Sequence, residues 1–384
     1  MISFVNPKSG FLQREDQVPP LGIMYLVAVL KKADIPAQIV DAGLGDEIPD
    51  GEIFITSTTP QWQEALKLQR HDWTVIGGPH ASTNHEWIFQ KHLFSQIVVG
   101  EGEEVIESVI KNKQHGRIFA PRIKDLDKLP FPDRTDAHRY NWMIDGKKAT
   151  TMMTSRGCNG QCSFCCKAVM DKGIYFRSPQ NVIEEARQLR QEGFGAVMFY
   201  DDSMAMKKDR LTAICEGLEP LDISWRCFVR SDQADPVMFH QMAQAGCREV
   251  LIGVESGSNK ILKNIRKHET AEMHRRAIFW AQRAGIKVKA LMIVGLPGET
   301  WSTIAESKQF IVETKPDFLD VTVLQVYPGC HIATNPEKYE LSFSEPSWYK
   351  GRNEEYESTV STPRMTAYDI VLAREILVST FNEL

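Results

Sequence analysis

Cysteine is absent from the first 157 residues of this 384-residue chain, and all eight cysteines lie between Cys158 and Cys330. Three of them crowd into eight consecutive positions. The disulfide framework of a secreted protein would usually spread its cysteines more evenly along the chain. We therefore expect thiols in place of disulfides, and a cytoplasmic, reducing location.

Long apolar runs and an excess of positive charge are also missing. No apolar stretch approaches the length of a membrane span, and the first seven residues contain no basic region. The formal net charge of −5 argues against a dedicated nucleic-acid-binding protein. With 42% hydrophobic and 25% charged residues, the composition is that of an ordinary globular protein. We expect neither a membrane nor a nucleic acid as a partner.

Short β-rich runs alternate with helical patterns through the first part of the chain. The expected strands cover residues 2–7, 37–42, 53–58, 74–78 and 96–100. This alternation predicts an α/β fold, with a doubly wound, Rossmann-like parallel sheet in a domain over residues 1–120. Ligands of such sheets bind beyond the carboxyl ends of the strands. The loops that follow the third, fourth and fifth strands are therefore candidates for a binding crevice.

A second alternation follows residues 121–148, which lack apolar periodicity and which we interpret as a linker. Its expected strands cover residues 149–154, 196–200, 224–229, 249–254, 288–294 and 318–326. Six β/α units predict a partial, TIM-like (β/α)6 barrel over residues 149–330, with its chemistry at the carboxyl ends of the strands. Residues 331–384 are expected to form a segment on the substrate side, ending in an amphipathic helix at 367–381.

Three thiols follow the first barrel strand on one expected loop, at Cys158, Cys162 and Cys165. Thiolates are the soft ligands that iron–sulfur clusters require, and three of them leave one iron of a [4Fe-4S] cluster without a protein ligand. The alternative is a structural zinc site. Zinc usually takes four ligands in paired short spacings, and no second pair is evident in this segment.

The cysteine triplet, with Phe164 just before its last member, resembles the signature of the radical S-adenosylmethionine superfamily. The resemblance implies that the open iron chelates S-adenosylmethionine. It also implies that one electron, from a donor such as flavodoxin or ferredoxin, cleaves the cofactor to a 5′-deoxyadenosyl radical. The protein itself would supply orientation and exclusion of water.

The same resemblance extends over the barrel and implies cofactor contacts at the ends of its strands. Asp202 is expected to accept a hydrogen bond from the cofactor's amino group, with Asp201 as the second choice. A paired aspartate also suits a simple helix cap, which remains open. The further S-adenosylmethionine contacts implied are Phe164, Arg230, Glu255, Ser256 and Gly295.

The remaining cysteines are less informative. Cys166 adjoins the triplet, and we interpret it as a packed or spare thiol. Cys215, Cys227 and Cys247 stand singly in apolar surroundings, where buried cysteine behaves as a small hydrophobic residue. Cys330 follows the last barrel strand, so a role near the substrate stays open for it.

The amino-terminal domain resembles the cobalamin-binding domain found ahead of many radical S-adenosylmethionine enzymes. The resemblance rests on Pro19, Pro20, Leu21 and Gly22 followed by Tyr25, and on two later loops at residues 77–80 and 99–103. It implies cobalamin contacts at Ser57, Thr58, Gly77, Gly78, His80, Gly100 and Glu101. The Asp-x-His-x-x-Gly loop that supplies a histidine below cobalt in mutases is missing. Cobalamin bound without that histidine and a vestigial domain both fit this absence.

Together these features predict a cobalamin-dependent radical S-adenosylmethionine methyltransferase that methylates an unactivated carbon. Non-methylating radical chemistry (oxidation, cyclisation, rearrangement or epimerisation) and a non-catalytic iron–sulfur sensor are the alternatives. A methylthiotransferase fits less well, because its amino-terminal domain would bring three further cysteines. The substrate is expected to be a peptide, a protein or a small molecule. Aromatic and basic residues of the last segment are either contacts for it or an exposed patch; they are Trp348, Tyr349, Lys350, Arg352 and Tyr356.

Overall fold

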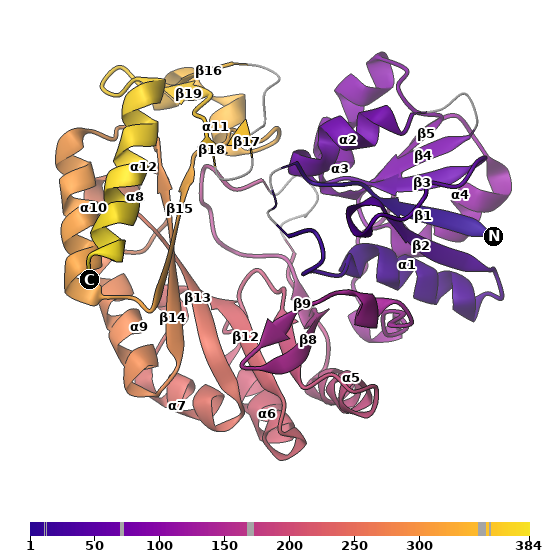
Figure 1. Ribbon diagram of the computed structural model, residues 1–384, viewed down its shortest axis with the longest axis horizontal. Coiled ribbons are helices and arrows are strands. Elements are labelled where there is room, and N and C mark those ends of the chain that lie inside the picture. The colour runs from indigo at the N-terminus through magenta and orange to yellow at the C-terminus, as the bar shows by residue number, and fades with distance from the viewer. Residues whose placement is uncertain (11, 13, 70–72, 167–172, 345–350, 353–354) are drawn as a thin grey trace. The chain divides into compact units, whose positions relative to one another are not determined.

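The computed structural model describes residues 1–10, 12, 14–69, 73–166, 173–344, 351–352 and 355–384, and the chain divides into two compact units. Unit 1 comprises residues 1–142 with 166–175 and 352–354, and unit 2 comprises the rest. Figure 1 follows the elements of each unit along the chain. Trp348, Tyr349 and Lys350 lie outside the described residues.

Unit 1 contains a six-stranded, fully parallel sheet in the order β2-β1-β3-β4-β5-β6. Its strands are β1 (Ile2–Asn6), β2 (Ala37–Asp41), β3 (Ile53–Thr56), β4 (Thr74–Gly77), β5 (Gln96–Val99) and β6 (Gly116–Phe119), and its helices are α1 (Leu21–Lys32), α2 (Trp62–Lys67), α3 (Gly78–Gln90) and α4 (Ile106–Asn112). The expected Rossmann-like sheet is confirmed, with β6 as an additional edge strand. The strand order reverses between β1 and β3, which is where open α/β sheets place their ligands.

The core of unit 1 explains why these segments fold as they do. The strands β1, β3, β4 and β5 each bury three consecutive residues, as strands of a parallel sheet covered on both faces do, and apolar residues of α1 and α4 pack against them. The buried cluster consists of Phe4, Ile23, Val27, Leu30, Phe54, Val75, Val98, Ile106 and Val109. Much of the expected linker also packs on this unit, where the amide of Asp133 donates to the carbonyl of Met24 at 3.0 Å. Met143, in contrast, already belongs to unit 2.

Unit 2 contains a seven-stranded sheet in the order β15-β14-β13-β12-β11-β8-β7. Its strands are β7 (Met143–Ile144), β8 (Lys147–Met152), β11 (Ala196–Phe199), β12 (Ser224–Val229), β13 (Cys247–Glu255), β14 (Lys287–Val294) and β15 (Phe318–Val323). The six strands from β8 to β15 are parallel, and β7 adds an antiparallel hairpin at one edge. The expected partial barrel is therefore confirmed.

Helices separate these strands and lie outside the curved sheet, as Figure 1 shows. They are α5 (Pro179–Gln191), α6 (Lys208–Leu218), α7 (Pro236–Gln244), α8 (Asn259–Asn264), α9 (Ala271–Arg283) and α10 (Trp301–Thr314). The terminal helix α12 (Ala367–Asn382), which was expected at residues 367–381, packs on α10 and β15. Smaller elements are β9 (Ser155–Arg156), β10 (Tyr175–Phe176), α11 (His331–Thr334), β16 (Ser342–Phe343), β17 (Gly351–Arg352), β18 (Glu355–Tyr356) and β19 (Val360–Ser361).

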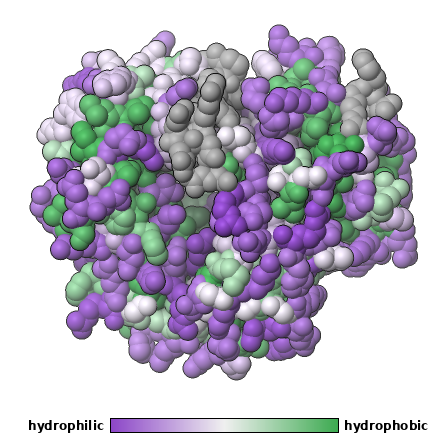
Figure 2. Space-filling model, viewed as in Figure 1, coloured by the Kyte–Doolittle hydropathy of each residue, from purple (hydrophilic) through white to green (hydrophobic). Residues whose placement is uncertain are grey.

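The surface is mixed in character. Figure 2 shows hydrophilic residues over most of the face presented, with hydrophobic residues in smaller patches between them. Among the helices that the structure describes, none has the length and apolar character needed to cross a membrane.

Candidate functional site

The candidate site of unit 2 lies at the carboxyl edge of its parallel strands. The cysteine loop follows β8, the two aspartates follow β11, and Arg230 follows β12. Glu255 ends β13, and Gly295 follows β14. Because parallel strands end at the same edge of a sheet, residues far apart in the sequence meet there.

The cysteine loop is fixed at its start by a buried aspartate. The Asp201 carboxylate is fully buried and accepts a hydrogen bond from the amide of Thr154 at 2.6 Å, and further bonds from the hydroxyls of Thr154 and Ser155. Burial raises the pKa of Asp201, and these hydrogen bonds oppose the rise. Asp201 is therefore committed to holding the chain that leads into the loop.

Asp202 has a different position. Its side chain is exposed, and one carboxylate oxygen accepts from the amide of Gly157, next to Cys158, at 3.1 Å. Of the two aspartates, Asp202 is thus the one placed to reach a ligand on this loop, which agrees with the order of preference set from the sequence. Its contact with a cofactor stays a prediction.

The loop itself bends around its first two thiols. The amide of Gly160 donates to Cys158 Sγ at 3.3 Å, and Arg230 Nη1 lies 4.0 Å from Cys162 Sγ. A Cβ atom on Gly160 would come within 3.1 Å of Arg230 Nη1 and 3.3 Å of Cys158 Sγ, so a larger residue would crowd both groups. Burial raises the pKa of the Cys162 thiol, whereas Lys267 and Arg230 lower it. The two cations thus favour the thiolate that a metal ligand must be.

The end of the loop is tied down by the backbone. The amide of Ser163 donates to the carbonyl of Ile265 at 2.8 Å, and the carbonyl of Ser163 accepts from the amide of Ile332 at 3.0 Å. Cys165 is exposed, and Phe164 is half-buried. The short helix α11 therefore helps to fix the segment between the second and third cysteines.

Among the described residues, no group of three or more His, Cys, Asp or Glu side chains converges on a single ion position. A [4Fe-4S] cluster places each thiolate on a different iron, so its ligands need not converge on one point. Three thiols on one loop, with two nearby cations, suit such a cluster.

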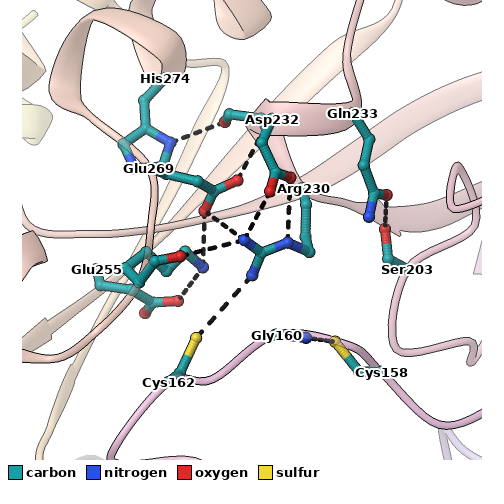
Figure 3. A network of polar contacts seen from close by, with 12 residues as sticks. Cys158, Gly160, Cys162, Ser203, Arg230, Asp232, Gln233, Glu255, Glu269 and His274 are labelled. Carbon is teal, nitrogen blue, oxygen red and sulfur yellow. Dashed lines mark hydrogen bonds and ion pairs between the residues drawn. The ribbon is translucent and has the colours of Figure 1, made fainter. Parts of the chain in front are cut away.

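Charged side chains that the sequence did not indicate surround Arg230, as Figure 3 shows. Its guanidinium donates through Nε and Nη2 to Asp232 at 3.1 and 3.0 Å, and Nη2 also donates to the carbonyl of Lys267 at 3.1 Å. Lys267 Nζ lies 2.9 Å from Glu255 Oε1 and 3.3 Å from Glu269 Oε2. Five charged groups thus form one network beside Cys162, and only Arg230 and Glu255 of them were expected at a site.

Glu255 owes its direction to an unusual backbone conformation. Its φ is +61°, in the left-handed region that side chains other than glycine rarely adopt. The register between β13 and β14 shifts at the same point. Such strain persists where the surroundings hold it in place, and here the Lys267 ion pair does so. Neighbouring Ser256 is buried, and its hydroxyl contacts Ser307 of α10 at 3.3 Å.

The loop after β14 is organised by a buried carboxylate. Glu299 accepts from the amides of Gly295 at 2.6 Å and Leu296 at 3.2 Å, while Gly295 has a φ of +86°. Burial raises the pKa of Glu299 to about 8, although both amides oppose the rise. The sequence pointed to the glycines of this loop, and the structure adds the carboxylate that shapes it.

Glu299 makes the stability of the protein depend on pH. Its unfolded form releases the proton near the ordinary value of 4.5, and its folded form near 8. Between these values the native state binds more protons, so the free energy of unfolding falls as pH rises, by at most about 1.4 kcal/mol per pH unit. Glu299→Gln keeps an oxygen acceptor for both amides and removes this term.

Urea unfolding of both proteins measures the effect. Relative to Glu299→Gln, the unchanged protein should lose stability steadily from pH 5 to pH 8. A stability difference that stays constant over this range would contradict the assignment.

Cys330 has a structural contact. It precedes α11, and its sulfur accepts from the amide of Ala333 at 3.4 Å, while the residue is buried. Cys215, Cys227 and Cys247 are buried in the core, as expected from their apolar surroundings. Cys166 is half-buried.

In unit 1 the structure brings together most of the residues expected at the crevice. The amide of Ser57 donates to the carbonyl of Gly77 at 3.1 Å, and the amide of His80 donates to the carbonyl of Ser57 at 2.9 Å. The amide of Gly100 donates to Ser82 Oγ of α3 at 3.0 Å. Hydrogen bonds thus connect the loop after β3, the first turns of α3 and the turn after β5.

Two glycines of these loops adopt conformations that favour glycine, with φ of +90° at Gly78 and +99° at Gly100. A Cβ atom on Gly78 would lie 2.7 Å from Thr56 Oγ1 and 2.9 Å from the amide nitrogen of Ser57. Thr58 is exposed, and its hydroxyl donates to Gln61. Glycine at both positions therefore lets the backbones of neighbouring segments come close together.

The side chains of His80 and Glu101 both contact other residues of the protein. His80 is fully buried, stacks on Trp62 with ring centroids 4.4 Å apart, and contacts Thr59 Oγ1 through Nδ1 at 3.1 Å. Burial lowers the pKa of His80 to about 3, so the ring is neutral. Glu101 accepts from Arg122 and from the amide of Ile123, both at 2.6 Å. The cobalamin contacts expected of both residues stay predictions.

A network of polar side chains lies at the ends of β1 and β2. It was not predicted from the sequence. The Asp41 carboxylate accepts from Asn6 Nδ2 at 2.9 Å and from the hydroxyl of Tyr140. Gln61 Nε2 donates to Asn6 Oδ1 at 2.9 Å and to the carbonyl of Pro7 at 2.7 Å. Burial and Asp41 raise the pKa of Tyr140. This network joins the ends of β1 and β2 to the loop after β3.

Comparisons with known proteins agree with this arrangement. The Radical SAM superfamily profile matches residues 152–311. An uncharacterized methyltransferase of Pyrococcus horikoshii is 27% identical over 82% of this chain and 77% of its own length. An anaerobic magnesium-protoporphyrin IX monomethyl ester cyclase of Rubrivivax gelatinosus is 23% identical over 85% of this chain and 68% of its own.

A solved structure is also similar in fold. The radical S-adenosylmethionine methyltransferase TsrM from Kitasatospora setae, with cobalamin and a [4Fe-4S] cluster bound, superimposes with a TM-score of 0.77. The match covers 98% of this chain and 90% of that one at 13% identity. At this identity the likeness is one of fold.

Proposed function

We propose that this chain, whose residues 152–311 match the Radical SAM superfamily, is a cobalamin-dependent radical S-adenosylmethionine methyltransferase that acts on an unactivated carbon. The observation that carries the proposal is the cysteine loop of unit 2, with Asp202 and Arg230 in contact with it, in a chain that also has a Rossmann-like unit. The similarity to methyltransferases in sequence and in fold supports it.

The residues that would hold the cofactors follow from the site. Cys158, Cys162 and Cys165 would ligate the [4Fe-4S] cluster, and Asp202, Glu255 and Gly295 stand at the strand ends where S-adenosylmethionine would bind. When bound, these groups supply a 5′-deoxyadenosyl radical that abstracts hydrogen, and cobalamin supplies the methyl group. The chain positions the thiolates and excludes water. A flavodoxin or ferredoxin would donate the electron.

The loop after β3, the start of α3 and the turn after β5 would form the rim that holds cobalamin. Gly78 and Gly100 let these segments approach one another closely, because a Cβ atom on Gly78 would clash with Ser57 and one on Gly100 would crowd the carbonyl oxygen of Ala120. His80 is buried against Trp62, so we propose that cobalamin binds with no histidine below its cobalt.

Metal counting tests the proposal. The protein is reconstituted anaerobically with iron and sulfide, loaded with hydroxocobalamin and freed of unbound ligand. We expect four irons and one cobalt per chain. Four irons without cobalt would overturn the cobalamin assignment and favour other radical chemistry.

A pair of glycine variants localises the cobalamin. Gly78→Ala forces a Cβ atom against Ser57, a strain of about 1–3 kcal/mol that should weaken cobalamin binding about tenfold or more. Gly51→Ala is the matched control, because Gly51 has a similar φ of +89° but precedes β3, at the opposite edge of the sheet, and this variant should bind cobalamin normally. Equal cobalt content in both variants would contradict the proposed crevice, and an unchanged iron content in both shows that unit 2 is intact.

Cyclisation is the second candidate, because relatives named as cyclases match over most of this chain. The two candidate reactions differ in whether the product carries a methyl group from S-adenosylmethionine. A methyltransferase moves a labelled methyl group from S-adenosylmethionine to its substrate, whereas a cyclase leaves that substrate unlabelled.

A further inference from the structure

The charged network beside Cys162 is more elaborate than the fold of the loop requires. Lys267 is almost fully buried, yet it lies between the carboxylates of Glu255 and Glu269. Burial alone would lower the pKa of Lys267, but Glu255 and Glu269 raise it above its ordinary value. Lys267 therefore keeps its positive charge inside the protein.

Arg230 is the second cation of this network, and it contacts Cys162. It lies between Cys162 and the carboxylates of Asp232 and Glu269, as Figure 3 shows. Its Nη1 lies 4.0 Å from the sulfur of Cys162. His274 adds no charge, because burial, Lys267 and Arg230 lower its pKa to about 3. Lys267 and Arg230 both favour a negative charge on the sulfur of Cys162, whereas Glu255 opposes it.

Buried charges are costly unless they are paired, so a network of this size next to a metal ligand calls for a reason. The charge of a cluster changes by one electron on reduction, from [4Fe-4S]2+ to [4Fe-4S]+, with no proton taken up in the step. A nearby cation stabilises the more negative, reduced form. Hydrogen bonds and charges around the sulfurs are a main determinant of cluster potentials.

We propose that Arg230 and Lys267, positioned by Asp232, Glu255 and Glu269, raise the reduction potential of the cluster bound through Cys162 and so make it reducible by the electron donor. The inference rests on the cluster of the proposed function and is independent of cobalamin. Arg230 and Lys267 act here as positioning residues through the cysteine ligand.

The test compares variants that remove a positive charge with a variant that removes a negative charge. Arg230→Met and Lys267→Met remove a positive charge, Glu269→Gln removes a negative one, and Arg230→Lys keeps the charge. Arg226→Met is a matched control, because Arg226 lies four residues earlier on β12 and pairs with Glu249 at 3.3 Å. Each protein is reconstituted, its iron is counted, and the cluster potential is titrated with dithionite and mediators by EPR, without S-adenosylmethionine.

We expect Arg230→Met and Lys267→Met to shift the reduction equilibrium about tenfold toward the oxidised cluster, which is about 59 mV for one electron. Glu269→Gln should shift it in the opposite direction, while Arg230→Lys and Arg226→Met stay within about twofold of the unchanged protein. A merely structural role would not make the sign of the shift follow the sign of the removed charge.

The outcomes separate this inference from the proposed function. Four irons with potentials that do not move, or that all move in one direction, overturn the inference alone. An unchanged protein that holds no cluster overturns the proposed function and the inference with it. If Arg230→Met fails to retain iron, Lys267→Met and Glu269→Gln still decide the result by their opposite shifts.

Discussion

Replacing Cys158, Cys162 or Cys165 with alanine is expected to lower the rate of 5′-deoxyadenosine formation by at least about a thousandfold, or about 4 kcal/mol in activation free energy. Each thiolate would ligate a different iron, so losing one leaves the cluster incomplete. The measurement combines an iron count with chromatographic assay of 5′-deoxyadenosine from S-adenosylmethionine.

Two neighbouring thiols are the controls for this experiment. Cys166→Ala changes the residue directly after the triplet, and Cys330→Ala changes a buried thiol that caps α11. Both should retain iron and cleavage activity. A cysteine variant of the triplet with full iron content and activity, or one tightly bound zinc in place of iron, would contradict the cluster assignment.

The second large effect is expected at Asp201. Asp201→Ala leaves the amide and hydroxyl of Thr154 and the hydroxyl of Ser155 buried without their acceptor. Removing a buried, hydrogen-bonded carboxylate in this way should lower the free energy of unfolding by about 3–5 kcal/mol. Iron retention should fall as well, because these residues lead into the cysteine loop.

Asp202→Ala is the matched comparison, since it changes the same residue type one position further along. Its carboxylate is exposed, so the free energy of unfolding should change by no more than about 0.5 kcal/mol. S-adenosylmethionine binding, measured by calorimetry on the reconstituted protein, should instead weaken about tenfold or more, as expected for loss of a charged hydrogen bond of about 1.5–3 kcal/mol. The reverse pattern, with Asp202 critical for folding and Asp201 for binding, would contradict the assignment.

The fold could be predicted from the sequence because its signal is periodic. Each expected strand is a short β-rich run bounded by turn residues, and strands expected at 224–229 and 288–294 match β12 and β14 closely. The edge strand β6 escaped prediction, because its four residues are only half-buried or exposed and include Arg117. An edge strand with little buried surface leaves a weak pattern.

The site could be predicted only in part, because burial of polar groups has no sequence pattern. Asp201 and Asp202 are identical in type, and only the fold shows that the first is buried and the second exposed. Lys267 and Glu269 resemble ordinary surface charges in the sequence, although both are buried in ion pairs. Glu101 was expected at the crevice, whereas the structure shows it paired with Arg122.

The most direct test of the central claim follows one methyl group. The reconstituted, cobalamin-loaded protein is reduced and given S-adenosylmethionine with a deuterated methyl group, and the cobalamin and nucleosides are then analysed by mass spectrometry. The account predicts a labelled methyl group on the cobalamin together with 5′-deoxyadenosine. Formation of 5′-deoxyadenosine with no label on the cobalamin would contradict the methyltransferase assignment.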